Sequence, residues 1–301
     1  MATLREIRRR IGGVKSTQKM TKAMKMVSAA KLRRAQDAVV AARPYAQKMK
    51  DLLGGLGGMT DIASNPLFSV PPVQNVTIIV ISSDRGMCGA FNFNIVRAVA
   101  AHIETNYAQL RNKGNLRLVV IGRKGFDFFQ KNGYPVAQKH LGLFASLKFS
   151  TAQEIADDAI DKFLDGKADR VELVYNEFKS ILHQHVRIEQ YLPIPVESLA
   201  LKSPGGPGNV QVGEYIYEPS SSGIMSSLIP KHLHFQIWRA LLESNAAEQG
   251  ARMSAMENAT TNATDLLKDL QLSYNKARQA SITKELLEIV GGAEALATSE
   301  N

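Results

Sequence analysis

Residues 82–89 (SSDRGMCG) come nearest in this chain to a ligand-binding motif. They follow an apolar, β-branched run and precede a segment typical of a helix, and α/β folds often bind ligands at such a point. The stretch lacks the third glycine of a dinucleotide-binding loop and the GxxxxGK(S/T) pattern of a phosphate-binding loop. The sequence therefore does not favour nucleotide binding here, and we expect no cofactor.

Cys88 is the single cysteine and would be the candidate nucleophile of this turn. A nucleophilic thiol needs a neighbouring base or positive charge that lowers its pKa. No histidine is near it in sequence, and His140, His183 or His185 could approach it only through folding. A single cysteine also excludes an internal disulfide and a cysteine-based zinc site, and it suits a reducing compartment.

The other histidines and the carboxylates show no spacing typical of a site. His232 and His234 are two residues apart, which on a helix points them in different directions. His183 and His185 share one face of a predicted strand without a third metal ligand nearby. The acidic residues are scattered, with no pair spaced for acid–base catalysis. We therefore expect no catalytic and no metal-binding residues.

The net charge of +9 is concentrated in the first fifty residues, which carry fourteen Lys or Arg side chains against two acidic ones. Such a segment suits an acidic partner. A basic helix can also follow the phosphates of nucleic acid, but this one has a single aromatic residue, Tyr45, and a Met/Val/Ala face suited to another helix. It lacks the Trp or Phe anchors of a helix on a membrane surface. A solvated basic face is the third explanation.

Residues 232–290 contain no proline and one glycine, Gly250, so almost nothing interrupts a helix. At about 1.5 Å per residue this helix would be on the order of 90 Å long and needs an equally long partner. Its charges exclude a membrane span, which leaves a coiled coil. The helical stripe consists of Ile229, Leu233, Ile237, Ala240, Ser244, Ala247, Ala251, Ala255, Ala259, Ala263, Leu266, Leu270, Tyr274 and Ala277. Its steps average about 3.7 residues, which does not by itself demand a left-handed supercoil.

Residues 3–53 predict the partner helix, with apolar side chains at three-four spacing from Leu4 onward. We expect Pro44 to bend or end this helix and residues 54–58, which are rich in glycine, to stop it. Residues 59–74 are rich in Pro, Asn and Ser and are predicted to be a linker.

The middle of the chain alternates short β-branched runs with helical segments, which predicts an α/β layer with a mainly parallel sheet and an antiparallel pair at its end. The predicted strands are residues 76–82, 116–121, 134–139, 171–178 and 185–192. The predicted helices are residues 91–110, 124–131 and 151–165, the last with Thr151 as N-cap.

The predicted fold class is α/β plus a long coiled coil, in which the N- and C-terminal helices pair antiparallel and carry a Rossmann-like α/β domain. We expect domain boundaries at 1–58 for the N-terminal helix, 75–200 for the α/β domain, 201–225 for a loop or hairpin and 226–301 for the C-terminal helix, capped by Ser226 or Ser227. The residues alone indicate a mechanical or scaffolding protein, and an enzyme or a nucleic-acid binder are the alternative classes.

Four segments carry a resemblance to a known family. Residues 17–33 (TQKMTKAMKMVSAAKLR) resemble the first helix of the gamma subunit of F-type ATP synthases, and residues 83–92 (SDRGMCGAFN) are similar to that family's SDRGLCGGLN segment. Residues 248–256 (EQGARMSAM) and 274–293 (YNKARQASITKELLEIVGGA) are similar to its C-terminal signature. The segments are in the family's order and span nearly the whole chain.

The resemblance implies a non-catalytic rotor shaft. In the family the terminal helices form an antiparallel, left-handed coiled coil inside a ring of three alpha and three beta subunits. The α/β domain sits with the epsilon subunit on a ring of c subunits, whose proton-driven rotation forces the catalytic sites through different affinities. The implied setting is the cytoplasmic face of a bacterial inner membrane, as a peripheral protein with no direct membrane insertion and no nucleic acid.

The resemblance also implies which residues touch the ring of alpha and beta subunits. By position these are Met24, Lys25, Arg252, Arg278, Gln279, Thr283 and Glu285. The family's chloroplast members carry an added cysteine pair for redox control, and with Cys88 alone this chain lacks that switch.

Overall fold

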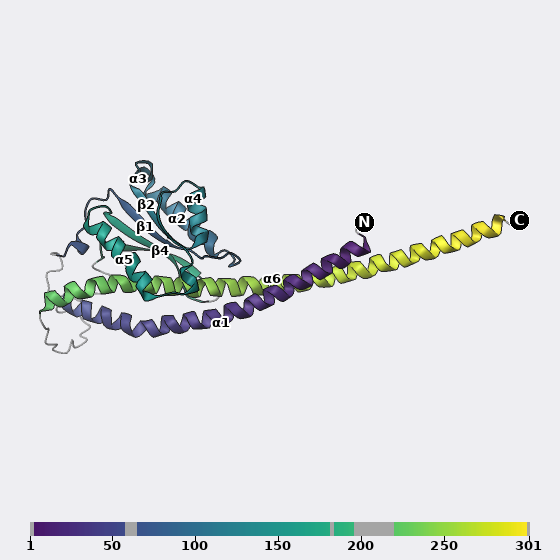
Figure 1. Cartoon of the computed structure of the whole chain (residues 1–301), viewed down its shortest axis with the longest axis horizontal. Coiled ribbons are helices and arrows are strands. Elements are labelled where there is room, and N and C mark those ends of the chain that lie inside the picture. The colour runs from purple at the N-terminus through teal and green to yellow at the C-terminus, as the bar shows by residue number, and fades with distance from the viewer. Residues whose placement is uncertain (1–2, 58–64, 181–183, 196–219, 300–301) are drawn as a thin grey trace. The chain divides into compact units, whose positions relative to one another are not determined.

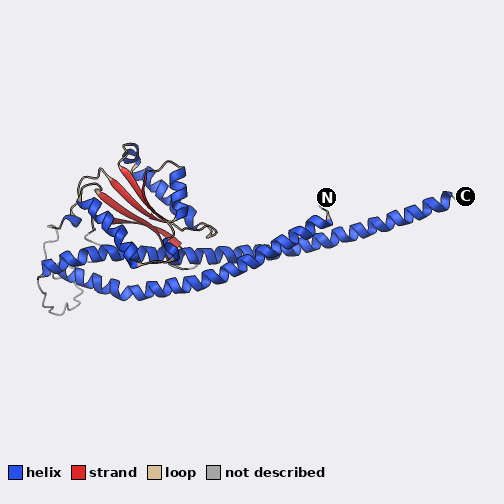
Figure 2. Ribbon diagram, in the orientation of Figure 1, coloured by secondary structure: helices blue, strands red, loops and turns tan. Residues whose placement is uncertain are grey.

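The structure, a computed structural model, describes residues 3–57, 65–180, 184–195 and 220–299. The chain divides into two compact units, one made of Met1–Val27 and Met253–Asn301 and the other of Ser28–Arg252. We call the first the helix-pair unit and the second the α/β unit. Figures 1 and 2 show the long helices and the sheet that make up these units.

Helix α1, Leu4–Gly57, continues past Pro44, and its described part ends inside the glycine-rich residues 54–58. Pro44 removes the amide that would bond the carbonyl of Val40. Both residues lie on the exposed side of the helix, where water can replace the missing donor. Leu53 and Leu56 are fully buried beyond the proline and hold the last turns of the helix in place.

Helix α6, Ser221–Ser299, begins before the predicted caps. The hydroxyl of Ser220 accepts a bond from the amide of Gly223 at 3.1 Å, so Ser220 caps the helix. Ser226 lies inside the helix, where its hydroxyl donates to the carbonyl of Ser222 at 2.9 Å. The prediction that Ser226 or Ser227 caps the helix is therefore wrong. The predicted loop at 201–225 lies mostly outside the described residues, and its last residues are helical.

Five described strands form one sheet in the order β3-β2-β1-β4-β5. The strands are β1 (Val76–Ile81), β2 (Leu116–Ile121), β3 (Val136–His140), β4 (Arg170–Phe178) and β5 (Gln184–Leu192). β1 pairs parallel with β2 on one side and with β4 on the other, and β4 pairs antiparallel with β5. The prediction of a mainly parallel sheet with an antiparallel pair at its end is confirmed. β1 is buried along its whole length, as its uninterrupted β-branched run indicates.

Helices cover both faces of this sheet. One face packs on α2 (Phe91–Asn106) and α4 (Arg123–Lys131), and the other packs on α5 (Phe149–Leu164), α6 and the end of α1. Phe149 of α5 meets Trp238 of α6 edge to face, with ring centroids 5.9 Å apart. Residues 28–57 of α1 and 221–252 of α6 thus contribute to the core of the α/β unit.

Three local expectations differ from the structure. α5 begins at Phe149 with Lys148 as N-cap, so Thr151 lies inside the helix and is not its cap. The helix predicted over 91–110 is two helices, α2 and the short α3 (Ala108–Asn112). The described part of the predicted linker contains a short 3-10 helix, Pro66–Phe68, whose N-cap Asn65 accepts from the amide of Leu67.

Candidate partner-contact surface

Three polar contacts join α1 to α6 in the helix-pair unit. The pairs are Gln18 with Thr264 (2.7 Å), Thr21 with Thr260 (2.8 Å) and Lys25 with Glu257 (2.6 Å). Because the residue numbers rise along α1 as they fall along α6, the two helices are antiparallel. The same direction holds in the α/β unit, where the Tyr45 ring lies 5.1 Å from that of Phe235, and Lys31, earlier on α1, interacts electrostatically with Glu248, later on α6. The predicted antiparallel pairing is therefore confirmed in each unit.

The buried seam of the helix-pair unit repeats at alternating steps of three and four residues. On α1 the seam positions are Leu4, Ile7, Ile11, Val14, Gln18, Thr21 and Lys25. On α6 they are Met253, Met256, Thr260, Ala263, Leu267, Leu270, Tyr274, Ala277 and Ser281. This spacing is the 3.5-residue period of a heptad coiled coil. Leu266, predicted on the seam, is 47% exposed, and Leu267 takes its place.

The C-terminal part of α6 is exposed where the sequence predicts ring contacts. Arg278, Gln279, Thr283 and Glu285 all point to solvent in the helix-pair unit. They share this segment with large apolar side chains that are 49% to 68% exposed. These are Ile282, Leu286, Leu287, Ile289 and Val290.

Met24 and Lys25 lie at the end of the seam on α1, Lys25 as its last position and Met24 beside it. Both are half-buried, and the Lys25 ammonium is bonded to Glu257, so it is engaged within the chain. Half-buried side chains of a helix pair face both the partner helix and the surroundings, a position compatible with the predicted contact.

Arg252 lies in a different environment from the other predicted contact residues. It is 8% exposed and its Nη1 lies 2.6 Å from Oε1 of Glu248, which is 4% exposed. Its Nη2 donates to the carbonyls of Arg85 and Gly86, each at 3.2 Å. Burial raises the pKa of Glu248, and Arg252 opposes that rise. Arg252 therefore joins α6 to the turn after β1.

The start of that turn is fixed to the sheet by Ser82. The Ser82 hydroxyl donates to the carbonyl of Ile121 at 2.9 Å and accepts from the amide of Gly125 at 2.9 Å. Gly122 has a φ of 95°, and a Cβ there would lie 2.2 Å from the carbonyl oxygen of Ser82. Glycine at this position thus permits the close approach of the two loops.

The rest of the turn is held by its own side chains. Asn92 and Ser83 are hydrogen-bonded through their side chains at 2.7 Å. The Asp84 carboxylate accepts from the amides of Arg123 and Gly142, at 3.2 and 2.8 Å. These groups bond to the protein itself, in the place where an α/β fold often holds a ligand.

Cys88 is buried in this turn. Burial raises the pKa of its thiol, while the bond to Ser83 and the nearby Arg252 lower it. Its Sγ lies 3.1 Å from the Asn92 amide nitrogen. A raised pKa favours the protonated thiol at neutral pH, which is the opposite of what a nucleophile needs.

The histidines have structural surroundings. His234 is paired with Asp157 of α5 at 2.6 Å, and His102 with Glu172 at 2.6 Å. Burial lowers the pKa of His232 to about 4. His183 lies outside the described residues, and those residues contain no group of three or more side chains that could hold a metal ion.

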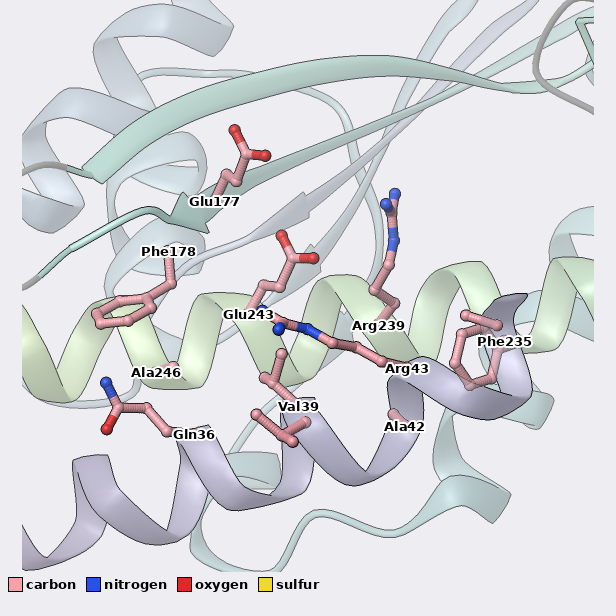
Figure 3. Close-up of a pocket in the computed structure, with 12 residues that line it drawn as sticks. Gln36, Val39, Ala42, Arg43, Glu177, Phe178, Phe235, Arg239, Glu243 and Ala246 are labelled. Carbon is pink, nitrogen blue, oxygen red and sulfur yellow. The ribbon is translucent and has the colours of Figure 1, made fainter. Parts of the chain in front are cut away.

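A groove of about 500 Å³ runs between α1, α6 and the end of β4 in the α/β unit (Figure 3). Figure 3 shows Glu243 of α6 and Glu177 of β4 along it, with Arg43 of α1 extending toward Glu243. Burial raises the pKa of Glu243, and Arg239 opposes that rise. Arg239 itself is bonded to Glu189 of β5 at 2.9 Å, which joins α6 to the edge strand.

Sequence reasoning missed two polar clusters of α6 that face the α/β domain, one half-buried around Arg239 and one buried around Arg252. The available signal is acid and base four residues apart, Arg239 with Glu243 and Glu248 with Arg252, on a helix whose stripe is otherwise small or apolar. That spacing is usually a surface pair. The distant partners, Glu189 and the carbonyls of Arg85 and Gly86, cannot be read from it.

This architecture defines a class of protein: two terminal helices that pair antiparallel, one of them continuing beyond the other's contacts, with an inserted Rossmann-like domain. Among the described residues, the turn that would bind a ligand in such a domain is bonded to the chain's own helix. The fold therefore indicates a mechanical role.

Comparison with known proteins places the chain. The family profile described as ATP synthase matches residues 3–296. The chain is 53% identical over 297 residues to the ATP synthase gamma chain of Chlorobaculum tepidum, covering 98% of this chain and 99% of that one. It is 51% identical over 303 residues to the gamma chain of Chloroherpeton thalassium, covering 99% and 100%.

Solved structures share the fold. A chain of the Euglena gracilis mitochondrial ATP synthase aligns with a TM-score of 0.67 at 22% identity, covering 99% of this chain and 96% of that one. A chain of the central stalk and c-ring structure from Tetrahymena thermophila aligns with a TM-score of 0.57 at 25% identity, covering 80% and 99%.

The chain belongs to the ATP synthase gamma chain family, whose members are the non-catalytic rotor subunits of the central stalk. Among the described helices, none combines the length and the apolar character of a membrane span.

Proposed function

We propose that this chain couples the proton-driven rotation of a c-ring to ATP synthesis and hydrolysis in a ring of three alpha and three beta subunits. Its proposed partners are the alpha, beta, epsilon and c subunits, and its proposed place is the cytoplasmic face of a bacterial inner membrane, as a peripheral subunit. The gamma chain relatives and the central stalk and c-ring structure support this proposal.

The observation that carries the proposal is the exposed C-terminal part of α6. Five large apolar side chains between Ile282 and Val290 are 49% to 68% exposed. A concentration of exposed apolar side chains on one helix is typical of a surface that a partner covers. Polar residues lie among them, and such contacts can be specific and still break at each step of a rotation.

The proposed contacts to the ring are those that the family resemblance implies. They are Met24, Lys25, Arg252, Arg278, Gln279, Thr283 and Glu285. Four of them are exposed on α6 and two are half-buried at the end of the seam on α1, which supports their assignment. Arg252 is buried, so its contact would be limited to the small exposed edge of its side chain.

The test uses the reconstituted ATP synthase with Arg278→Ala or Gln279→Leu in this chain. Because both side chains are exposed, the thermal unfolding of the chain should not change. The number of protons pumped per ATP hydrolysed should fall by several-fold. Lys276→Ala is the matched control, since Lys276 is an exposed cation on the same helix that is not among the proposed contacts. Full proton pumping by both test variants would contradict the assignment.

A further inference from the structure

Glu248 and Arg252 form a buried pair on α6, and among the described residues the groups of the α/β domain that bond to it are backbone carbonyls. Arg252 uses one nitrogen for Glu248 at 2.6 Å and the other for two backbone carbonyls, those of Arg85 and Gly86. Removing a charged pair from water carries a large free-energy cost, and the cost is offset only when the remaining donors find partners. The two carbonyls supply those partners.

The carbonyls that Arg252 bonds lie at the point of the sheet where α/β folds usually bind a ligand. They lie in the turn that follows β1, and β1 is flanked by β2 on one side and β4 on the other. In open α/β sheets the crevice between strands whose connections run in opposite directions is the usual ligand site. Here α6 fills it, since Ala247 and Ala251 pack against Cys88, Phe91 and Phe178.

An arginine suits this place for geometric reasons. Its planar guanidinium presents donors in a fixed fork, so one group can reach a carboxylate and two carbonyls together. A lysine ammonium at the same position has a shorter reach and no such fork. Ala247 and Ala251, one turn before Arg252 and next to it, let the helix come close enough for these bonds.

The outward side of the turn is exposed. Met87 has a φ of 61° and is 65% exposed, and Arg85 is exposed beside it. A residue other than glycine keeps a positive φ only where its surroundings fix the backbone. The two carbonyls that precede Met87, those of Arg85 and Gly86, are both bonded to Arg252.

We propose that Arg252 is a positioning residue that clamps residues 82–89 to α6, so that the turn keeps one orientation while the shaft transmits torque. The clamp is a property of the α/β unit alone, whereas its consequence for coupling rests on the proposed function. Arg252 thereby acts on coupling through the turn, in addition to any contact of its exposed edge with the ring.

Cys88 is the probe that tests the clamp. It is the single cysteine of the chain and is 1% exposed between the turn and α6, so its alkylation reports opening of the turn. Reconstituted ATP synthase carrying Arg252→Gln or Arg252→Lys is treated with a maleimide, and labelling of this chain is followed by mass spectrometry. Proton pumping per ATP hydrolysed is measured on the same samples.

The matched control is Arg239→Gln. Arg239 is also an arginine of α6 paired with a carboxylate, Glu189 at 2.9 Å, but it does not touch the turn. We expect Arg252→Gln to label Cys88 about ten-fold faster than the unchanged chain, Arg252→Lys to give a smaller increase, and Arg239→Gln to label at the unchanged rate. Pumping per ATP should fall in the order of the labelling rates.

Two results would overturn the proposal, and they differ in what they leave standing. An unchanged labelling rate in Arg252→Gln would show that there is no clamp, and a loss of pumping in that case would point to direct contact with the ring. Faster labelling with unchanged pumping would show that the clamp exists and has no part in coupling. Failure of the proposed function itself would appear separately, as a reconstituted ATP synthase that contains the unchanged chain and hydrolyses ATP without pumping protons.

Discussion

Helix α6 is packed differently in the two units. In the α/β unit, the seven residues 246–252 of α6 are all buried, because α1 lies on one side and the α/β domain on another. In the helix-pair unit α6 has one buried seam, and residues 282–290 are all exposed. The first arrangement fixes the helix on all sides, and the second holds it by one line of contacts.

The two units also differ in the kind of side chain that lies between α1 and α6. The core around the ends of α1 and α6 in the α/β unit is made of large apolar side chains such as Leu53, Leu56 and Leu233, all fully buried. The last three positions of the helix-pair seam on α1 are polar: Gln18, Thr21 and Lys25. Apolar burial gives more stability than exchanging bonds with water for bonds within the protein. We therefore expect stability to be concentrated in the α/β unit.

The largest effect should come from Leu53→Ala. Leu53 is fully buried, so the change removes apolar contacts and leaves a cavity, and we expect a loss of about 3 kcal/mol in the free energy of unfolding. Leu270→Ala on the half-buried seam is the comparison and should cost about 1 kcal/mol. Urea unfolding of the full chain measures both. Equal losses would contradict the contrast between the units.

The second largest effect should be a loss of stability at low pH, and it should come from the α/β unit. Burial lowers the pKa of His232 from 6.5 to about 4, so the folded state binds fewer protons than the unfolded one. The stability tied to a neutral His232 is fully present above pH 6.5 and is lost as the pH falls toward about 4. Between pH 7 and 4.5, the free energy of unfolding of the His232→Gln variant should fall by about 2 kcal/mol less than that of the unchanged chain. The helix-pair unit contains no histidine, and parallel pH curves would refute the assignment.

In the polar part of the seam, single and double substitutions should have non-additive effects on the free energy of unfolding. Thr21 and Thr260 are hydrogen-bonded at 2.8 Å, and Thr21→Val should cost about 1 kcal/mol because that bond is lost. Changing both threonines to valine should recover most of the loss, since two apolar side chains replace two polar ones of similar shape. A double-mutant cycle on the full chain measures the coupling, and purely additive losses would argue against a bond in the seam.

The smallest effect belongs to the exposed pair. Lys25 and Glu257 lie 2.6 Å apart, but their side chains are 37% and 55% exposed, so water and salt screen the attraction. Glu257→Gln should change the free energy of unfolding by about 0.5 kcal/mol or less, and less still in 0.5 M salt. A loss comparable to that of Leu53→Ala would show that the seam depends on this pair.

Much of the fold can be predicted from local patterns. The strands are found because each is a short β-branched run between turn residues, and the long helices because almost no proline or glycine interrupts them. The seam is less well predicted. Near Ala247 and Ala251 α6 is buried on all sides, so no single stripe exists there, and an average taken across both units hides the 3.5-residue period beyond Met253.

The candidate site shows the same limit. Arg278, Gln279 and Glu285 are implied by the family resemblance, and the structure has them exposed on α6. The burial of Arg252 does not follow, since its carbonyl partners are more than a hundred and sixty residues away and carbonyls leave no mark in a sequence. The helix start was misplaced because several serines near residue 220 can cap, and only geometry selects one.

Trp238 is the single tryptophan of the chain, and its ring rests on Phe149 of α5. Its fluorescence is therefore an intrinsic optical signal for the docking of α5 on α6, whereas far-ultraviolet circular dichroism sees helices in both units. Heating the chain while recording both signals would show, without any label, whether helices of the helix-pair unit unfold before the α/β unit does.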